Sequence, residues 1–254
     1  MKTPIKDDLN FKSSRIIKEL IPKKSVVSSF LFYSGALEFS LAEDKRFVVS
    51  HTNKHVIYEF WDCLLREAKT VGRMAKNLFS KIQNENIFYT FQEAWPTYKD
   101  PNFRSALFFI LNRCSEGGHI SCGKFNKNLL SGFALANLQN FKIENFYINF
   151  DSEDNWTNNL DEKGEKADYL LFPVGKYNFN LFEYGKNKGF EFTAVNHREL
   201  CNILTPMDKR WVVLYKNHKK VFDLYKDHHI IMVDQYGRKT SKKDKCEDIV
   251  IANF

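Results

Sequence analysis

Side chains suited to nucleic-acid contact gather in one short stretch of the sequence, LNRCSEGGHISCGKFNKN. They are Asn112, Arg113, His119, Lys124 and Asn126. Asn and Arg can each bond two atoms of one base edge, adenine for Asn and guanine for Arg, whereas Lys contacts phosphate. These side chains could therefore contact DNA, and a polar surface hairpin is the alternative interpretation.

The same stretch contains Cys114, His119 and Cys122, which are soft ligands of the kind that zinc accepts. No fourth ligand nearby has the pairwise spacing of a zinc site, so we expect no metal. The chain has five cysteines, an odd number without tight pairing, which indicates reduced thiols rather than a disulfide framework.

The charge balance points to the same kind of partner. The 254 residues include 38 Lys and Arg against 31 Asp and Glu, giving a net charge of +7 and a pI near 9.0. Such an excess favours a polyanionic partner through counterion release, and a Lys-rich solvated surface is the alternative. No apolar run approaches the roughly 18 residues of a membrane span, and the first residues lack the apolar part of a signal peptide. We therefore expect a cytoplasmic protein without membrane contact.

Apolar segments of strand length alternate with amphipathic helices along most of the chain. Helices are expected at 14–20 and 55–67, and strands at 26–33, 46–50, 145–150, 169–172, 211–215, 230–234 and 248–252. Residues 71–140 break this rhythm, because they are helical in pattern and contain a buried helix at 104–112. Alternation with short links is typical of a parallel sheet covered on both faces. We therefore expect an α/β fold with a mostly parallel, seven-stranded twisted sheet and a helical insertion.

The order of several segments resembles one enzyme family. FYSGALEF, KDPNFRSALFFILNR, DYLLFPVG, WVVLYKNH and DIVIANF follow one another as the corresponding segments do in the Dam-type DNA adenine-N6 methyltransferases. The resemblance covers almost the whole chain. It implies a Rossmann-like methyltransferase fold built from residues 1–70 and 141–254, with residues 71–140 resembling a DNA target-recognition subdomain. It also implies S-adenosylmethionine as cofactor and double-stranded DNA as partner. The succession of Asn-Arg, Gly-Gly and basic-aromatic-Asn in LNRCSEGGHISCGKFNKN is also similar to the one by which this family reaches DNA.

The catalytic motif of that family is altered in this chain. Its Asp-Pro-Pro-Tyr aligns with Phe172, Pro173, Val174 and Gly175. In the family, the acid and a backbone carbonyl accept the two N–H bonds of the flipped adenine, and the aromatic ring stacks on the base. Phe172 thus replaces the acid and Gly175 replaces the ring. The six prolines are never adjacent, so no shift of register restores the motif; Tyr177 is a nearby ring, and Asp168 is the nearest preceding acid.

The cofactor-binding positions are altered too. The resemblance assigns them to Phe32, Tyr33, Ser34, Gly35, His51 and Asn53. The family's Phe-x-Gly-x-Gly turn ends here in Ala36, whose Cβ projects where the backbone approaches the nucleoside. His51 stands where a carboxylate holds the ribose hydroxyls, which a neutral imidazole cannot replace, although Asn53 can compensate in part. The N-terminal Gly-Gly-Lys turn is Phe-Lys-Ser-Ser at residues 11–14.

These losses together predict a protein without catalysis. Removing one transition-state donor or acceptor typically costs about 100- to 1000-fold in rate, and here the acceptor, the stacking ring and the ribose anchor are all replaced. We expect a pseudoenzyme that binds S-adenosylmethionine poorly and acts as a DNA-binding or protein-interaction module. Two alternatives stay open: an active adenine-N6 DNA methyltransferase with divergent motifs, and a protein that binds another small nucleotide in the cofactor cleft.

Overall fold

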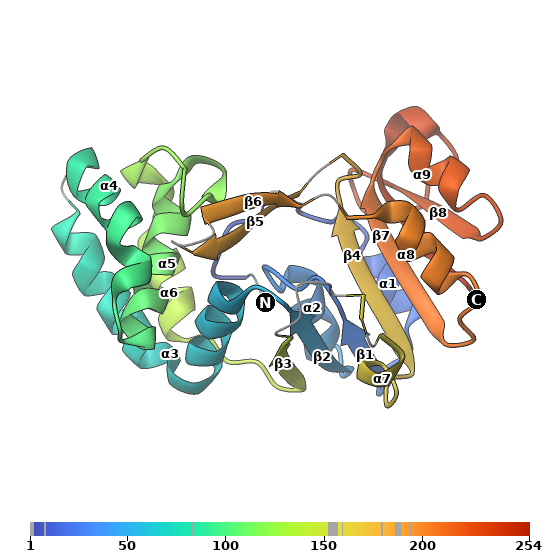
Figure 1. Ribbon diagram of the computed structural model, residues 1–254, viewed down its shortest axis with the longest axis horizontal. Helices are drawn as coiled ribbons and strands as arrows, with labels where there is room; N and C mark the ends of the chain where they lie inside the picture. The colour runs from blue at the N-terminus through green and yellow to red at the C-terminus, as the bar shows by residue number, and fades with distance from the viewer. Residues whose placement is uncertain are drawn as a thin grey trace.

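The computed structural model describes residues 3–7, 9–82, 84–151, 157–158, 160–178, 180–185, 189–193 and 195–254. For residue 161 and for 180–185 and 189–193 only the backbone is described. The strands form one seven-stranded sheet and a separate hairpin, and a group of helices stands at one end of the molecule (Figure 1). Within the described part of the chain, no helix is long and apolar enough to cross a bilayer.

The large sheet is mostly parallel, as expected. In spatial order its strands are β3 (Phe146–Phe150), β2 (Phe47–Thr52), β1 (Val26–Ser29), β4 (Tyr169–Gly175), β7 (Arg210–Lys216), β9 (Cys246–Ala252) and β8 (His229–Asp234). The first five run parallel, and β9 runs antiparallel to both β7 and β8. The prediction of an α/β fold with a seven-stranded, mostly parallel sheet is therefore confirmed.

Burial on both faces explains the continuous apolar sequence of the central strands. Every residue of β4 is buried. Along it, Tyr169 and Leu171 join one apolar cluster, whereas Leu170 and Phe172 join the other. Because successive side chains of a strand point to opposite faces, the two clusters lie on opposite sides of the sheet.

In the part of the chain that the structure describes, five helices accompany the sheet in addition to those of the insertion. They are α1 (Ser14–Leu20), α2 (Ala36–Glu43), α7 (Leu160–Lys163), α8 (His197–Leu204) and α9 (Lys219–Leu224). A short 3-10 turn, η4 (Lys243–Lys245), precedes β9. The helix expected at 14–20 forms with those bounds.

The insertion is helical and begins inside a long helix. α3 (His55–Lys81) starts as the expected 55–67 helix, kinks at Glu67 where φ is −139°, and continues into the insertion. The other insertion elements are α4 (Glu85–Ala94), η1 (Trp95–Thr97), α5 (Pro101–Cys114), η2 (Glu116–Gly118), η3 (Lys127–Leu129) and α6 (Gly132–Gln139). The side chain of Asp100 caps α5, and Pro101 occupies its first position, where a missing N–H costs nothing.

The insertion shares its core with the sheet. Phe60 of α3 stacks on Phe108 of α5, with ring centroids 4.8 Å apart. Both residues belong to the same apolar cluster as Val27 of β1 and Leu171 of β4. The helices 71–140 are therefore packed onto the α/β part through a continuous apolar core rather than joined to it by a linker.

Two features differ from the expected elements. The strand expected at 26–33 ends at Ser29, because Leu31 has a left-handed backbone with φ of +58°. A hairpin of β5 (Asn180–Gly185) and β6 (Gly189–Thr193) was not expected at all. It extends from the end of β4 toward the insertion (Figure 1).

Candidate functional site

A cavity of about 520 Å³ lies at the carboxyl ends of β1 and β4. The strand order reverses between these two strands, since the chain continues from β1 to β2 and β3 on one side and from β4 to β7 on the other. Ligands of open α/β sheets bind at such a reversal point. The cavity is lined by the N-terminal segment, the turn between β1 and α2, α6, Arg113 and Pro173.

One wall of the cavity is the N-terminal segment, residues 3–7 and 9–13, which is bonded to the insertion. The backbone N–H of Lys6 donates to Asn112 Oδ1 at 2.7 Å, and Asn112 Nδ2 donates back to the Lys6 carbonyl at 3.2 Å. Lys6 Nζ donates to the Arg113 carbonyl at 2.7 Å. Arg113 Nε in turn donates to the Pro4 carbonyl at 2.5 Å. These reciprocal bonds hold the segment against the C-terminal end of α5.

The other end of the same segment is bonded to the sheet through Asp248. This residue of β9 is fully buried, and its Oδ2 accepts the backbone N–H groups of Lys12 and Ser13 at 2.5 and 2.9 Å. Its Oδ1 accepts Lys216 Nζ at 2.7 Å. Three donors thus satisfy the buried carboxylate, and two of them hold the residues that directly precede α1 in place.

Among the described residues two carboxyl groups line the cavity, and sequence analysis had identified neither of them. Asp7 accepts the Ser34 hydroxyl at 2.5 Å and the Leu9 N–H at 2.8 Å. Glu38, in the first turn of α2, accepts the Ser29 hydroxyl at 2.8 Å. Burial raises the pKa of Glu38, and the negative charge of Asp7 raises this pKa further, against the hydrogen bonds that lower it. The only sequence signal for a carboxyl group in the cavity was the position of Glu38 among the apolar residues of the stretch GALEFSLAE.

The predicted cofactor-binding turn reaches the cavity only in part. Tyr33, Ser34 and Gly35 line it, whereas Phe32 is 1% exposed and packs against the rings of Phe39, Trp61 and Phe146. Gly35 has a φ of +71° and a Cβ at this position would lie 2.4 Å from the Phe39 ring. The glycine is thus required by the start of α2. Asn53 is half-buried after β2 and lies outside the cavity lining.

The positions aligned with the catalytic acid and the ribose acid come together, but as packed rings. Phe30 stacks on His51 with centroids 4.9 Å apart, and on Phe172 with centroids 5.1 Å apart. We call His51, Phe30 and Phe172 the ring column; His51 belongs to β2, Phe30 directly follows β1, and Phe172 belongs to β4. All three side chains are buried, and none of them lines the cavity.

The ring column adjoins a partly buried ion group. Asp151 Oδ1 lies 3.7 Å from His51 Nδ1, and Asp151 Oδ2 lies 3.3 Å from Lys163 Nζ. Burial alone would raise the pKa of Asp151, but His51 and Lys163 outweigh burial and hold it below its ordinary value. The interactions with His51 and Lys163 therefore stabilise the ionised form of Asp151.

The remaining motif positions at the end of β4 are also structural. Val174 is buried and lies at a bulge in the pairing of β4 with β7. Gly175 has a φ of +88°, which a glycine adopts without strain. Only Pro173 of the four aligned positions lines the cavity.

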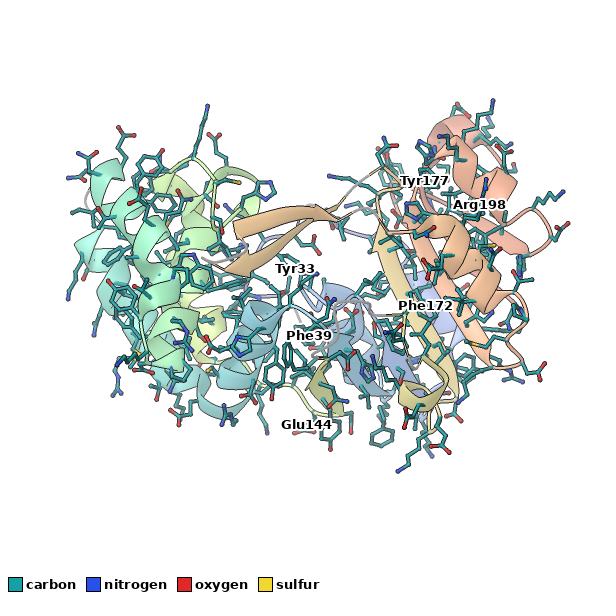
Figure 2. The ribbon with its side chains drawn as sticks, in the orientation of Figure 1. Tyr33, Phe39, Glu144, Phe172, Tyr177 and Arg198 are labelled. Carbon is teal, nitrogen blue, oxygen red and sulfur yellow. The ribbon has the colours of Figure 1, made fainter. Side chains whose placement is uncertain are left out.

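Tyr177 is covered on both faces. Its ring stacks on His197 at 4.2 Å and on His218 at 4.5 Å. Figure 2 places Tyr177 beyond the end of β4, and Tyr33 between the sheet and the insertion. Burial lowers the pKa of His197, which keeps this imidazole neutral, so its Nε2 donates to the Tyr177 carbonyl at 2.6 Å and its Nδ1 accepts the Tyr215 hydroxyl at 3.0 Å. Tyr177 does not offer a free face for a base in this arrangement.

The five residues predicted to contact DNA occupy different environments. Asn112 is fully buried and Arg113 is bonded to the N-terminal segment, as described above. This gives Asn112 a structural role in place of the predicted base contact. His119 and Asn126 are half-buried, and Asn126 Oδ1 caps η3, while Lys124 is exposed.

Metal ligands do not gather in the described residues, where no three His, Cys, Asp or Glu side chains form a group that could hold an ion. None of the five cysteines forms a disulfide; Cys122 is exposed and the other four are buried. Cys114 is the last residue of α5, and the loop that follows is bonded to α4, since Gln92 Nε2 donates to the Gly123 carbonyl at 3.1 Å.

The sheet and the cavity together define the class of the protein. It is an α/β protein of the Rossmann-like kind, with a cavity of ligand size at the reversal point of the strand order. No protein-family model matches the sequence, and no curated protein matches it either.

Proposed function

We propose that this protein is a divergent relative of the Dam-type DNA adenine-N6 methyltransferases that does not transfer methyl groups and that binds double-stranded DNA. The observation that carries the proposal is the ring column. The position of the catalytic acid holds Phe172, whose side chain is fully buried against Phe30 and does not reach the cavity. The aligned position therefore presents no carboxylate to accept an N–H of the adenine amine.

The cofactor of that family does not fit the cavity in the way that the resemblance implies. His51, aligned with the ribose acid, lies in the ring column and outside the cavity lining. The carboxylates that do line the cavity, Asp7 and Glu38, already accept the hydroxyls of Ser34 and Ser29. This disagreement supports the loss of methyl transfer.

DNA binding is supported by the charge of the protein. The net charge is +7, and Lys124 of the insertion is exposed. Exposed cations that neutralise phosphates bind DNA without reading its sequence, and such binding weakens as salt rises.

The test of catalysis is radiolabelled methyl transfer from S-adenosylmethionine to unmethylated duplex DNA, with an active adenine methyltransferase as positive control. We expect no incorporation above the level without protein. Clear incorporation would refute the proposal. DNA binding is measured in parallel by fluorescence anisotropy at about 50 and 200 mM salt, where the affinity should fall by at least tenfold if about four phosphates are contacted.

A second candidate function is the binding of a small nucleoside without methyl transfer. It is favoured by the cavity itself, which combines two carboxyl groups with the aromatic side chains of Phe11, Tyr33 and Phe133. Aromatic faces and a few polar groups are typical of sites for such ligands. Calorimetry with adenosine and with S-adenosylmethionine tests it; heat of binding with adenosine supports it, and no heat with either removes it.

A further inference from the structure

Two regions of the chain account for its net positive charge. Residues 71–140 contain eight Lys and Arg against four Asp and Glu, and residues 217–247 contain eight against five. The rest of the chain contains 22 of each sign. The whole net charge of +7 therefore resides in the insertion and in the segment that follows β7.

The second of these regions forms one surface. We give the name C-terminal basic surface to six of its exposed basic residues: Lys219, Lys220, Arg238, Lys239, Lys242 and Lys243. Three elements bring them together: α9, the turn after β8, and the turn before β9. Asn217 Nδ2 donates to the Lys243 carbonyl at 3.3 Å, and Lys243 Nζ lies 4.9 Å from the centre of the Phe222 ring. These contacts hold the turn before β9 against α9.

The surface lies at the edge of the sheet that contains the cavity. α9 follows the carboxyl end of β7, and β8 runs in the direction of β7 because both are antiparallel to β9. The turn after β8 also touches the N-terminal segment, since a Cβ at Gly237 would lie 2.7 Å from the Lys12 carbonyl oxygen. Figure 1 shows α9 and β8 on one side of the β5–β6 hairpin and the helical insertion on the other.

Acidic residues do not cancel this surface. Arg238 pairs with Asp234 at 3.3 Å and Lys239 pairs with Glu19 at 3.5 Å, and the two basic side chains are 66% and 60% exposed. Exposed pairs of this kind are worth about 0–1 kcal/mol and exchange readily for another anion. Asp223, Asp227, Asp244 and Glu247 are also exposed in the segment 217–247, where the eight basic residues still exceed the five acidic ones by three.

We propose that the C-terminal basic surface binds the phosphate backbone of duplex DNA, so that the duplex crosses the edge of the sheet between this surface and the insertion. The inference rests on the DNA binding proposed above and assigns its main contact region. Five of the six cations are lysines, which act as point charges toward phosphate, whereas planar bidentate recognition of a base edge is typical of Arg. The surface thus positions DNA without selecting a sequence.

The test compares two triple variants with the same change of net charge. Lys219→Gln/Lys220→Gln/Lys242→Gln removes half of the surface. The control, Lys24→Gln/Lys45→Gln/Lys166→Gln, removes three exposed lysines at the opposite edge of the sheet. Affinity for two duplexes of unrelated sequence is measured across salt concentrations, after thermal unfolding has shown that both variants fold like the wild type.

We expect the surface variant to lose at least about tenfold in affinity at about 50 mM salt on both duplexes, with a shallower salt dependence, because up to three phosphate contacts are lost. The control should lose less than about threefold. Equal losses in the two variants would overturn the inference while leaving DNA binding in place. A wild-type protein that binds neither duplex at low salt would instead refute the proposed function.

Discussion

The ring of Phe172 stacks on the ring of Phe30 with centroids 5.1 Å apart and planes inclined by 12°. Both rings are buried in the apolar cluster on the α8 face of the sheet. The residue that would have to present an acid to a substrate is therefore part of the packing between β1 and β4. A change at this position acts first on stability and only then on chemistry.

Replacing Phe172 by aspartate should not restore methyl transfer. The carboxylate would lose the stacking contact and be buried among apolar groups, so we expect a loss of about 3–5 kcal/mol in the free energy of unfolding. Phe172→Leu, which keeps an apolar side chain, should cost clearly less. Urea unfolding and radiolabelled methyl transfer check both variants, and incorporation by Phe172→Asp alone would show that the cavity can still position both substrates.

Replacing Asp248 by alanine should release the N-terminal segment. The backbone N–H groups of Lys12 and Ser13 would lose their acceptor and Lys216 would lose its partner, which we expect to cost about 2–3 kcal/mol. Limited proteolysis should then cleave before residue 13 faster than in the wild type. Asp244→Ala, the same change at an exposed position, is the control, and an unchanged cleavage rate in Asp248→Ala would contradict the assigned anchor.

Replacing Glu38 by glutamine should flatten the pH dependence of stability. Because burial raises the pKa of Glu38 above its ordinary value of 4.5, the folded protein binds this proton more tightly than the unfolded chain does. The resulting stabilisation is complete below pH 4.5 and is lost as pH rises through the folded pKa. Glutamine resembles the protonated form, so the variant should unfold at a higher temperature than the wild type at pH 7.

The measurement for Glu38 is thermal unfolding between pH 4 and pH 7. Glu43→Gln, at the exposed end of the same helix, serves as the control because it removes the same charge. Parallel pH profiles for the wild type and Glu38→Gln would show that the carboxyl is not held in its neutral form.

Alkylation of the native protein should select Cys122. Its side chain is exposed, whereas burial raises the pKa of Cys114 to about 11 and also raises the pKa values of Cys63 and Cys246. At pH 8 the smaller thiolate fraction alone should slow the alkylation of Cys114 by about 100-fold relative to that of an ordinary thiol. Mass spectrometry after iodoacetamide treatment shows the order in which the cysteines are modified. In the control, in urea, all five thiols should be modified. Early modification of Cys114 in the native protein would contradict its burial at the end of α5.

Local patterns in the sequence were sufficient for most of the large sheet. The seven strands lie close to where apolar runs predicted them, and α1 has the predicted bounds, because strand and helix periodicities are properties of short segments. The segments NLFEYG and GFEFT are separated by Lys-Asn-Lys. Their alternation of residue types and the glycines at 185 and 189 are sequence signals of a hairpin. These signals were present in the sequence but were not recognised.

The sequence by itself determined the α/β class, the helical insertion and the absence of the Asp-Pro-Pro-Tyr motif, since each depends on residue types and their spacing. Only the tertiary structure decided which side chains face the cavity. Asp7 and Glu38 meet there from distant segments, Asn112 is buried by a segment 106 residues away, and Phe172 is enclosed by a ring from the neighbouring strand. Such relationships arise from long-range packing, which no local pattern encodes.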